Sequence, residues 1–163
     1  AKREPNLKTY GVSDLIKKFY LITILVVIFD QVTKYLAANI TDPISIIPDV
    51  LQLRYVINTG AAFGLFQGAK VILGFLSVFI VAGILYFIVY QKDVREKYWL
   101  PLSFMAGGAL GNAIDRLFYV GVIDFIDIRF WPVFNIADMF ITLAVVLIFI
   151  IDFRTNRKEK KKV

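Results

Sequence analysis

The sequence predicts a mainly α-helical membrane protein with four transmembrane helices and a small β-sheet outside the membrane. The chain of 163 residues is 58% apolar, above the roughly 45–50% of soluble domains, and its mean hydropathy is +0.68. Residues 71–91 contain no charged side chain, and a bilayer core needs about 20 helical residues per crossing. A stretch of alternating apolar and polar residues in a long loop predicts the sheet. These observations exclude a soluble globular protein.

Four apolar segments are the predicted membrane spans: residues 19–35, 71–90, 98–117 and 133–151. The second has no charged residue, whereas each of the others contains at least one. A polar segment, 1–18, precedes the first span, and a basic segment, 152–163, follows the last. We predict that both are cytoplasmic tails and that residues 19–151 form one four-helix membrane domain.

The first span also has features of a cleavable signal peptide. Lys17 and Lys18 precede its apolar run, and two alanines follow it at 37–38. However, Asp30 and Lys34 interrupt the run before these small residues, which is atypical of a signal peptide. We therefore interpret this span as a retained helix.

The charge distribution predicts the orientation of the chain. The two tails and the link 92–97 hold 14 of the 19 basic residues and six of the 13 acidic ones, a net charge of +8. The remaining segments carry a net charge of −2. Because basic residues concentrate on the cytoplasmic side of membrane proteins, both termini and the link 92–97 are expected to be cytoplasmic.

The two external connections differ in character. Residues 41–69 form a long loop with Pro43 and Pro48, and residues 51–55 alternate as a half-buried strand does. We expect a small sheet within this loop, on the outer membrane surface. Residues 118–132 are predicted to form a shorter loop with Gly121 and a compact acidic stretch.

The chain contains neither histidine nor cysteine. This excludes thiol nucleophiles, disulfides, thiolate zinc sites and Ser-His triads. The net charge of +6 fits membrane orientation rather than nucleic-acid binding, because the basic residues flank apolar runs. No loop is rich in oxygen ligands, so we expect neither a metal nor a cofactor.

Several acidic residues are predicted to lie near the outer interface, where an ionisable side chain in hydrocarbon costs about 2.5–3.5 kcal/mol. Asp30 and Lys34 are four residues apart on one helix face, which favours a structural ion pair over a catalytic role. Asn112, Asp115 and Arg116 also share one helix face. We interpret these three as scaffolding for a site.

Glycines in the third span predict close packing between helices. Gly107 and Gly111 form a small-xxx-small step, with Gly108 on the turn beside them. In membranes this spacing indicates helix packing more often than ligand binding.

Asp124 in the second external connection and Asp138 at the start of the fourth span are the remaining acidic residues of interest. In one interpretation they are a loop acid and a helix-capping acid. In the other they meet and share a proton, and one activates water while the other protonates a leaving amine. Their spacing alone leaves both interpretations open.

Five short motifs appear in a recognisable order: FDQVTKY (29–35), NTGAAFG (58–64), GGALGNAIDR (107–116), VIDF (122–125) and FNIAD (134–138). Together they resemble those of lipoprotein signal peptidases, the bacterial signal peptidase II family. The resemblance extends from about residue 19 to residue 151.

The resemblance implies an aspartic endopeptidase of the bacterial inner membrane, with its site toward the outer face. It would remove the signal peptide of a prolipoprotein before a diacylglyceryl-modified cysteine, act among membrane lipids, and be inhibited by globomycin-like cyclic peptides. We expect a monomer, although the sequence leaves the oligomeric state open. The catalytic aspartates of the family correspond to Asp124 and Asp138. Its supporting residues correspond to Asp30, Lys34, Asn58, Asn112, Arg116 and Asn135, with backbone positions at Gly60 and Gly108.

Two other classes of protein also fit a small helical membrane chain. A proton- or ion-coupled transporter would bury acidic residues, but they would run across the full depth of the membrane. Here they stop at one interface. A purely structural four-helix subunit would not need a convergent set of Asp and Asn side chains.

Overall fold

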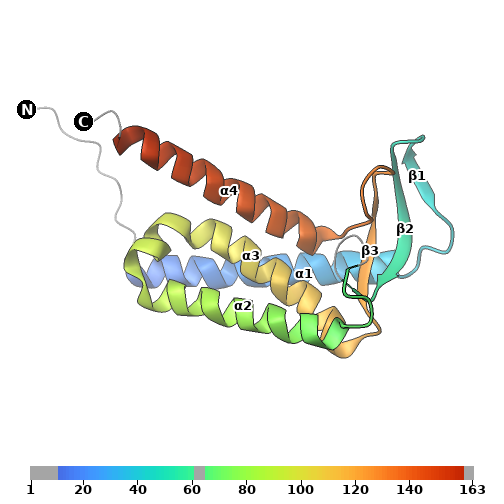
Figure 1. Ribbon diagram of the computed structural model, residues 1–163, viewed down its shortest axis with the longest axis horizontal. Helices are drawn as coiled ribbons and strands as arrows, with labels where there is room; N and C mark the ends of the chain where they lie inside the picture. The colour runs from blue at the N-terminus through green and yellow to red at the C-terminus, as the bar shows by residue number, and fades with distance from the viewer. Residues whose placement is uncertain (1–10, 61–64, 160–163) are drawn as a thin grey trace, which may run out of the picture.

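The computed structural model describes residues 11–60 and 65–159. In this part of the chain, four helices and three strands follow one another (Figure 1). Their order and bounds are α1 (Val12–Ala37), β1 (Ile44–Ile47), β2 (Leu51–Asn58), α2 (Lys70–Tyr90), α3 (Lys92–Phe118), β3 (Val122–Asp127) and α4 (Ile136–Glu159).

The helices run side by side, and the sheet stands across one end of the bundle (Figure 1). α3 is central, because it packs against α1, α2 and α4. Three points lie at the end of the bundle away from the sheet: the start of α1, the junction of α2 and α3 at Gln91, and the end of α4. The described parts of the predicted cytoplasmic segments therefore lie at the same end of the bundle.

Glycines allow α3 to approach its neighbours closely. A Cβ on Gly107 would lie 2.6 Å from Cβ of Val26 in α1, and one on Gly108 would lie 2.5 Å from the carbonyl oxygen of Ala137 in α4. A Cβ on Gly111 would collide with the Asp30 carboxylate. The predicted packing role of these glycines is confirmed.

The sheet is antiparallel in the order β1-β2-β3. The sequence predicted it within residues 41–69, and this is only partly right, because β3 comes from the connection that was predicted to be a loop. Val56 of β2 pairs with Asp124 of β3, and Asn58 pairs with Val122. The pairing therefore brings two polar side chains, Asn58 and Asp124, to the same part of the sheet.

The helix bounds also differ from the predicted spans. α1 begins at Val12, inside the segment predicted as a tail, and α4 continues to Glu159. The predicted link 92–97 is the beginning of α3. Charged residues are compatible with a helix, so an apolar run marks only part of each helix and not its ends.

Two described helices are long and apolar enough to cross a membrane, α2 and the 136–157 portion of α4. Both leave large apolar side chains uncovered, such as Phe79 (77% exposed) and Phe149 (73% exposed). Exposed apolar surface on this scale marks a face that contacts lipid or another protein. α1 and α3 are also long enough but carry more charged residues.

Candidate active site

A buried ionic cluster joins α1 to α3 at the sheet end of the bundle. Lys34 Nζ lies 2.8 Å from an oxygen of Asp30 and 2.8 Å from an oxygen of Asp115, and all three side chains are at most 2% exposed. Gln31 donates a further hydrogen bond to Asp115 at 3.0 Å. The structure confirms the Asp30–Lys34 pair and adds a second acidic partner from α3.

The same cluster fixes the two segments that carry Asp124 and Asp138. Asp30 accepts a hydrogen bond from the Ala137 N–H at 2.9 Å, at the start of α4. Asp115 accepts one from the Ile123 N–H at 3.2 Å, in β3. Each carboxylate therefore holds the backbone next to one of the candidate catalytic residues.

Two buried asparagines connect the ionic cluster to these aspartates. Lys34 donates to Oδ1 of Asn112 at 2.9 Å, and Nδ2 of Asn112 donates to Asp138 at 2.8 Å. Nδ2 of Asn135 lies 3.1 Å from Oδ1 of Asn112 and 2.7 Å from Oδ1 of Asp124. The network therefore extends from α1 through α3 to both aspartates.

Asn135 and Asp138 form a reciprocal cap at the start of α4. The Asp138 N–H donates to Oδ1 of Asn135 at 3.0 Å, and the Asn135 N–H donates to Oδ2 of Asp138 at 3.3 Å. This is the geometry of a capping box, which satisfies two free N–H groups of the first turn. The cap fixes the backbone of Asp138 in the first turn of α4.

Asp124 lies in the middle of β3 and is 2% exposed. It accepts hydrogen bonds from Nδ2 of Asn58 at 3.0 Å and from Nδ2 of Asn135 at 2.7 Å. The pKa of the Asp124 carboxyl is raised to about 7, because burial and the nearby Asp138 outweigh the lowering effects of the two amides and of Lys34. A carboxyl with this pKa can exchange a proton near neutral pH.

Asp127, on the same strand, behaves in the opposite way. Burial raises its pKa, but hydrogen bonds from the Arg129 N–H, Gln52 and Arg54 outweigh this and bring the pKa below its usual value. The Arg54 and Gln52 side chains are each 2.7 Å from its carboxylate. Asp127 therefore serves as an ionic tie within the sheet.

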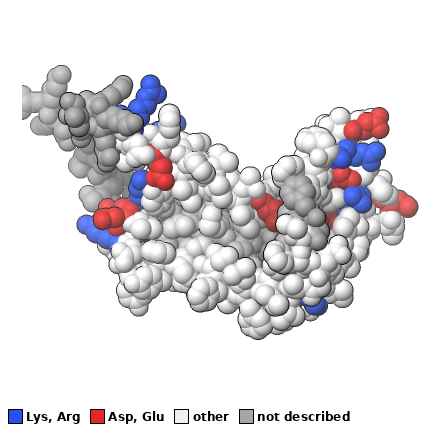
Figure 2. Space-filling model, in the orientation of Figure 1, with Lys and Arg blue, Asp and Glu red and all other residues white. Residues whose placement is uncertain are grey.

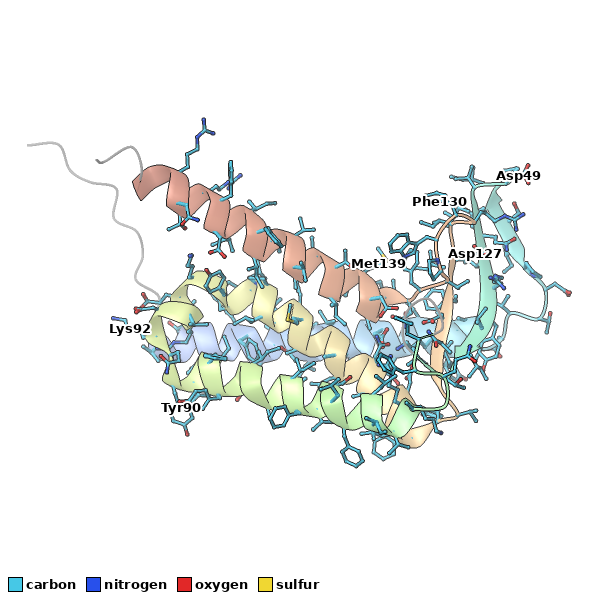
Figure 3. The ribbon with its side chains drawn as sticks, viewed as in Figure 1. Asp49, Tyr90, Lys92, Asp127, Phe130 and Met139 are labelled. Atoms are coloured by element: carbon cyan, nitrogen blue, oxygen red, sulfur yellow. The ribbon has the colours of Figure 1, made fainter. Side chains whose placement is uncertain are left out.

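Asp124 and Asp138 line one cavity of about 240 Å³ with Asn58, Asn112 and Arg116. Figure 2 shows acidic side chains at the bottom of the notch between α4 and the sheet. An apolar groove of about 500 Å³ adjoins this cavity and shares Asp138 with it. Its sides carry Phe130 and Met139, which are labelled in Figure 3.

Arg116 lines this cavity and lies close to Gly60. Nη2 of Arg116 is 3.4 Å from the Gly60 carbonyl oxygen, and the Gly60 N–H donates to Oδ1 of Asn58 at 3.0 Å. A Cβ on Gly60 would lie 2.5 Å from the Leu65 carbonyl oxygen, so only glycine fits there. Residues 61–64 of the NTGAAFG motif lie outside the described residues.

The structure brings all the predicted site residues to the sheet end of the bundle. Gln31 is an additional member that the sequence analysis did not single out; its only signal was a polar side chain beside Asp30 in an apolar span. Within the described residues, no group of three or more acidic side chains is placed to hold a metal ion.

Comparison with known proteins identifies the family. The family model described as signal peptidase (SPase) II matches residues 22–154, which include every residue of the network and both aspartates. The chain belongs to the signal peptidase II family. This confirms the resemblance seen in the five motifs and makes the protein a peptidase by family.

Individual relatives of this signal peptidase II family member cover most of its length. The lipoprotein signal peptidase of Microcystis aeruginosa is 38% identical over 141 residues, which are 83% of this chain and 91% of the relative. That of Staphylococcus aureus (strain JH9) is 37% identical over 150 residues, 86% of this chain and 92% of the relative.

Solved structures share the fold. A bacterial membrane enzyme determined by the in meso method at 2.3 Å resolution is 37% identical and superposes with a TM-score of 0.78, covering 86% of this chain and 90% of the other. A second, determined at 1.9 Å, is 38% identical with a TM-score of 0.72, covering 83% and 92%. The arrangement of helices and sheet is thus that of known membrane enzymes.

Proposed function

We propose that this protein is an intramembrane aspartic endopeptidase. Its substrate is a diacylglyceryl-modified prolipoprotein, and it removes the signal peptide by cutting before the lipidated cysteine. The observation that carries this proposal is the pair Asp124 and Asp138, which line one cavity and are linked through Asn135. Family membership supports the substrate class.

The chemistry of the pair is general acid–base catalysis. One carboxylate takes a proton from a water molecule, which attacks the scissile carbonyl, and the other carboxyl protonates the leaving amine. Two carboxyl groups that line one small cavity disfavour double ionisation, so they hold one proton between them near neutral pH. That single proton is what the two roles require. The mechanism uses no cofactor and no metal.

The proposal places four helices in the membrane. α2 and α4 are apolar enough by themselves, whereas α1 and α3 pair three of their charges in the buried Asp30–Lys34–Asp115 cluster. Paired and hydrogen-bonded charges lower the cost of burial. Both termini are cytoplasmic and the sheet lies on the outer face of the inner membrane, as the charge distribution favours.

The apolar groove beside Asp138 gives the site access to an apolar substrate. Met139, Leu143 and Val146 line it along α4, and Phe130 lines it from the segment that follows β3. A signal helix and a lipid anchor are both apolar, while Asn58 and Asn112 contribute polar groups to the lining of the adjoining cavity, where the peptide backbone would lie. We expect globomycin-like cyclic peptides to inhibit cleavage by occupying the groove and the cavity together.

Incubation of the purified protein with a synthetic prolipoprotein tests this function. We expect the diacylglyceryl form to be cut before the modified cysteine, with little cleavage of the unmodified precursor. Mass spectrometry of the products gives the cut site. Equal cleavage of both forms would contradict lipid recognition, and cleavage of neither would contradict the function.

A proton- or ion-coupled transporter is not favoured. α2 carries no charged side chain between Lys70 and its end at Tyr90, and the charges of α1 and α3 that are buried together lie at the sheet end. A transport path needs polar groups across the full depth of the membrane. In liposomes that contain the protein, we expect no proton or ion flux above that of empty liposomes.

A further inference from the structure

We propose that the two aspartates have fixed and different roles: Asp138 is the ionised general base, and Asp124 is the protonated general acid. This inference rests on the proposed function. It assigns the single proton of the pair to one of the two side chains, on the basis of how each is held.

Asp138 receives donors that suit a carboxylate. It lies in the first turn of α4, where the free N–H groups of a helix favour negative charge. Its Oδ2 accepts the Asn135 N–H at 3.3 Å, and its Oδ1 accepts Nδ2 of Asn112 at 2.8 Å. Oδ1 of the same Asn112 accepts from the Lys34 ammonium at 2.9 Å, which polarises the amide toward a stronger donor. A carboxylate that receives such donors is favoured in its charged form.

Asp124 lacks these features. It is in a strand rather than at a helix terminus, it is 2% exposed, and its two donors are the neutral amides of Asn58 and Asn135. Asp138 is less buried and lies at the opening of the cavity into the apolar groove. Desolvation therefore disfavours charge on Asp124 more than on Asp138. The pKa of Asp124, raised to about 7, agrees with this.

The charged groups around the pair do not reverse this preference. α1 contributes Asp30 and Lys34, and α3 contributes Asp115 and Arg116. These two anions and two cations balance, so they impose no net charge on the pair. Lys34 also reaches Asp138 through one amide, Asn112, whereas the path to Asp124 continues through Asn135.

The assignment defines each step of the reaction. The oxygen of water forms a bond to the scissile carbonyl carbon, and the water proton passes to Asp138. Asp124 then donates its proton to the amide nitrogen as the carbon–nitrogen bond breaks, which releases an amine and a carboxylic acid. Transfer of the proton from Asp138 back to Asp124 restores the starting state.

An ester substrate separates the two roles. Replacing the scissile nitrogen by oxygen gives a leaving group that departs without prior protonation, so the general acid becomes less important while the base is still needed. We would measure kcat/KM of the wild type, Asp124→Asn and Asp138→Asn on matched amide and ester forms of the diacylglyceryl substrate.

We expect Asp124→Asn to lose at least about 10²–10⁴-fold on the amide, the usual contribution of one acid–base group, and to lose about tenfold or less on the ester. Asp138→Asn should lose comparable activity on both. The assignment would be overturned if the ester restored kcat/KM of Asp138→Asn rather than of Asp124→Asn. It would also be overturned if both variants lost kcat/KM equally on both substrates. A wild type that cleaves neither substrate would contradict the proposed function itself.

Infrared difference spectroscopy gives a second measurement that requires neither turnover nor activity. At about pH 5, below the pKa of about 7 of Asp124, the wild type should show the C=O stretch of a buried protonated carboxyl. We expect this band to disappear in Asp124→Asn and to remain in Asp138→Asn. Its loss in Asp138→Asn and persistence in Asp124→Asn would overturn the assignment.

Discussion

Lys34 on α1 lies 2.8 Å from Asp115 on α3, and each of the two side chains is only 2% exposed. The same ammonium is 2.8 Å from Asp30. Removal of Lys34 would leave two buried carboxylates without their cation, and removal of either acid would weaken the hydrogen bonds that the cluster makes to its neighbours, so the cluster is sensitive to single substitutions. The candidate site therefore rests on an ionic support that contacts neither aspartate directly.

Asp115→Asn should destabilise the protein by about 1–3 kcal/mol, the cost of weakening buried hydrogen bonds to a charged group, because Lys34 keeps its pair with Asp30. The variant removes a charge that faces Lys34 and weakens the hydrogen bonds from Gln31 and Ile123 N–H. Thermal unfolding in detergent measures the change, with the exposed Asp42→Asn as the control. A melting temperature equal to that of the wild type would contradict the supporting role.

Gly108→Ala should lower activity while the helices stay folded. Its Cβ would lie 2.5 Å from the Ala137 carbonyl oxygen, so α3 or the start of α4 must shift and displace Asp138. Gly83→Ala is the matched control, because its Cβ would have no atom within 4 Å. Cleavage kinetics beside far-UV circular dichroism test this. Equal activity of the two variants would contradict the prediction that a shift of α3 or α4 displaces Asp138.

The topology predicts where single cysteines become accessible. A cysteine at Asp42 should react with an impermeant thiol reagent added outside intact cells, and one at Lys92 should react only after the membrane is opened. The chain has no native cysteine, so no background labelling arises from it. Labelling of both positions from the same side would contradict the orientation given by the charge distribution.

Activity should fall as pH rises through about 7. Burial raises the pKa of Asp124, so its proton is present below about 7 and lost above it. Because the acid must be protonated, kcat/KM should decrease on the alkaline side of a bell-shaped profile. Measurement of kcat/KM from about pH 5 to about pH 9 shows this limb. A constant kcat/KM throughout that range would contradict the role of a protonated Asp124.

Some of this architecture could be predicted from local sequence. The Asp30–Lys34 pair follows from helical spacing alone, and the structure confirms it. The glycines at 107 and 111 predicted close packing because small residues at that spacing are typical of helix–helix interfaces in membranes. The alternating residues 51–55 predicted strand β2.

Other features depend on contacts between distant segments. β3 was missed because its acidic residues at 124 and 127 interrupt the apolar pattern; only pairing with β2 makes it a strand. The second partner of Lys34 and the role of Gln31 depend on how α1 packs against α3. Whether Asp124 and Asp138 share a cavity likewise depends on the placement of β3 beside the start of α4, which sequence spacing does not determine.

The central claim is that the two aspartates act as one catalytic unit. The most direct test is cleavage of the diacylglyceryl prolipoprotein by Asp124→Asn, Asp138→Asn and the double variant, all purified and shown to be folded. Asp49→Asn is the control, because Asp49 is exposed in the turn before β2 with φ 59°, a conformation that asparagine adopts readily.

We predict that each single variant loses at least about 10²–10⁴-fold in rate, that the double variant is hardly worse than either, and that Asp49→Asn matches the wild type. Near wild-type cleavage by a folded Asp124→Asn or Asp138→Asn protein would contradict the two-aspartate mechanism.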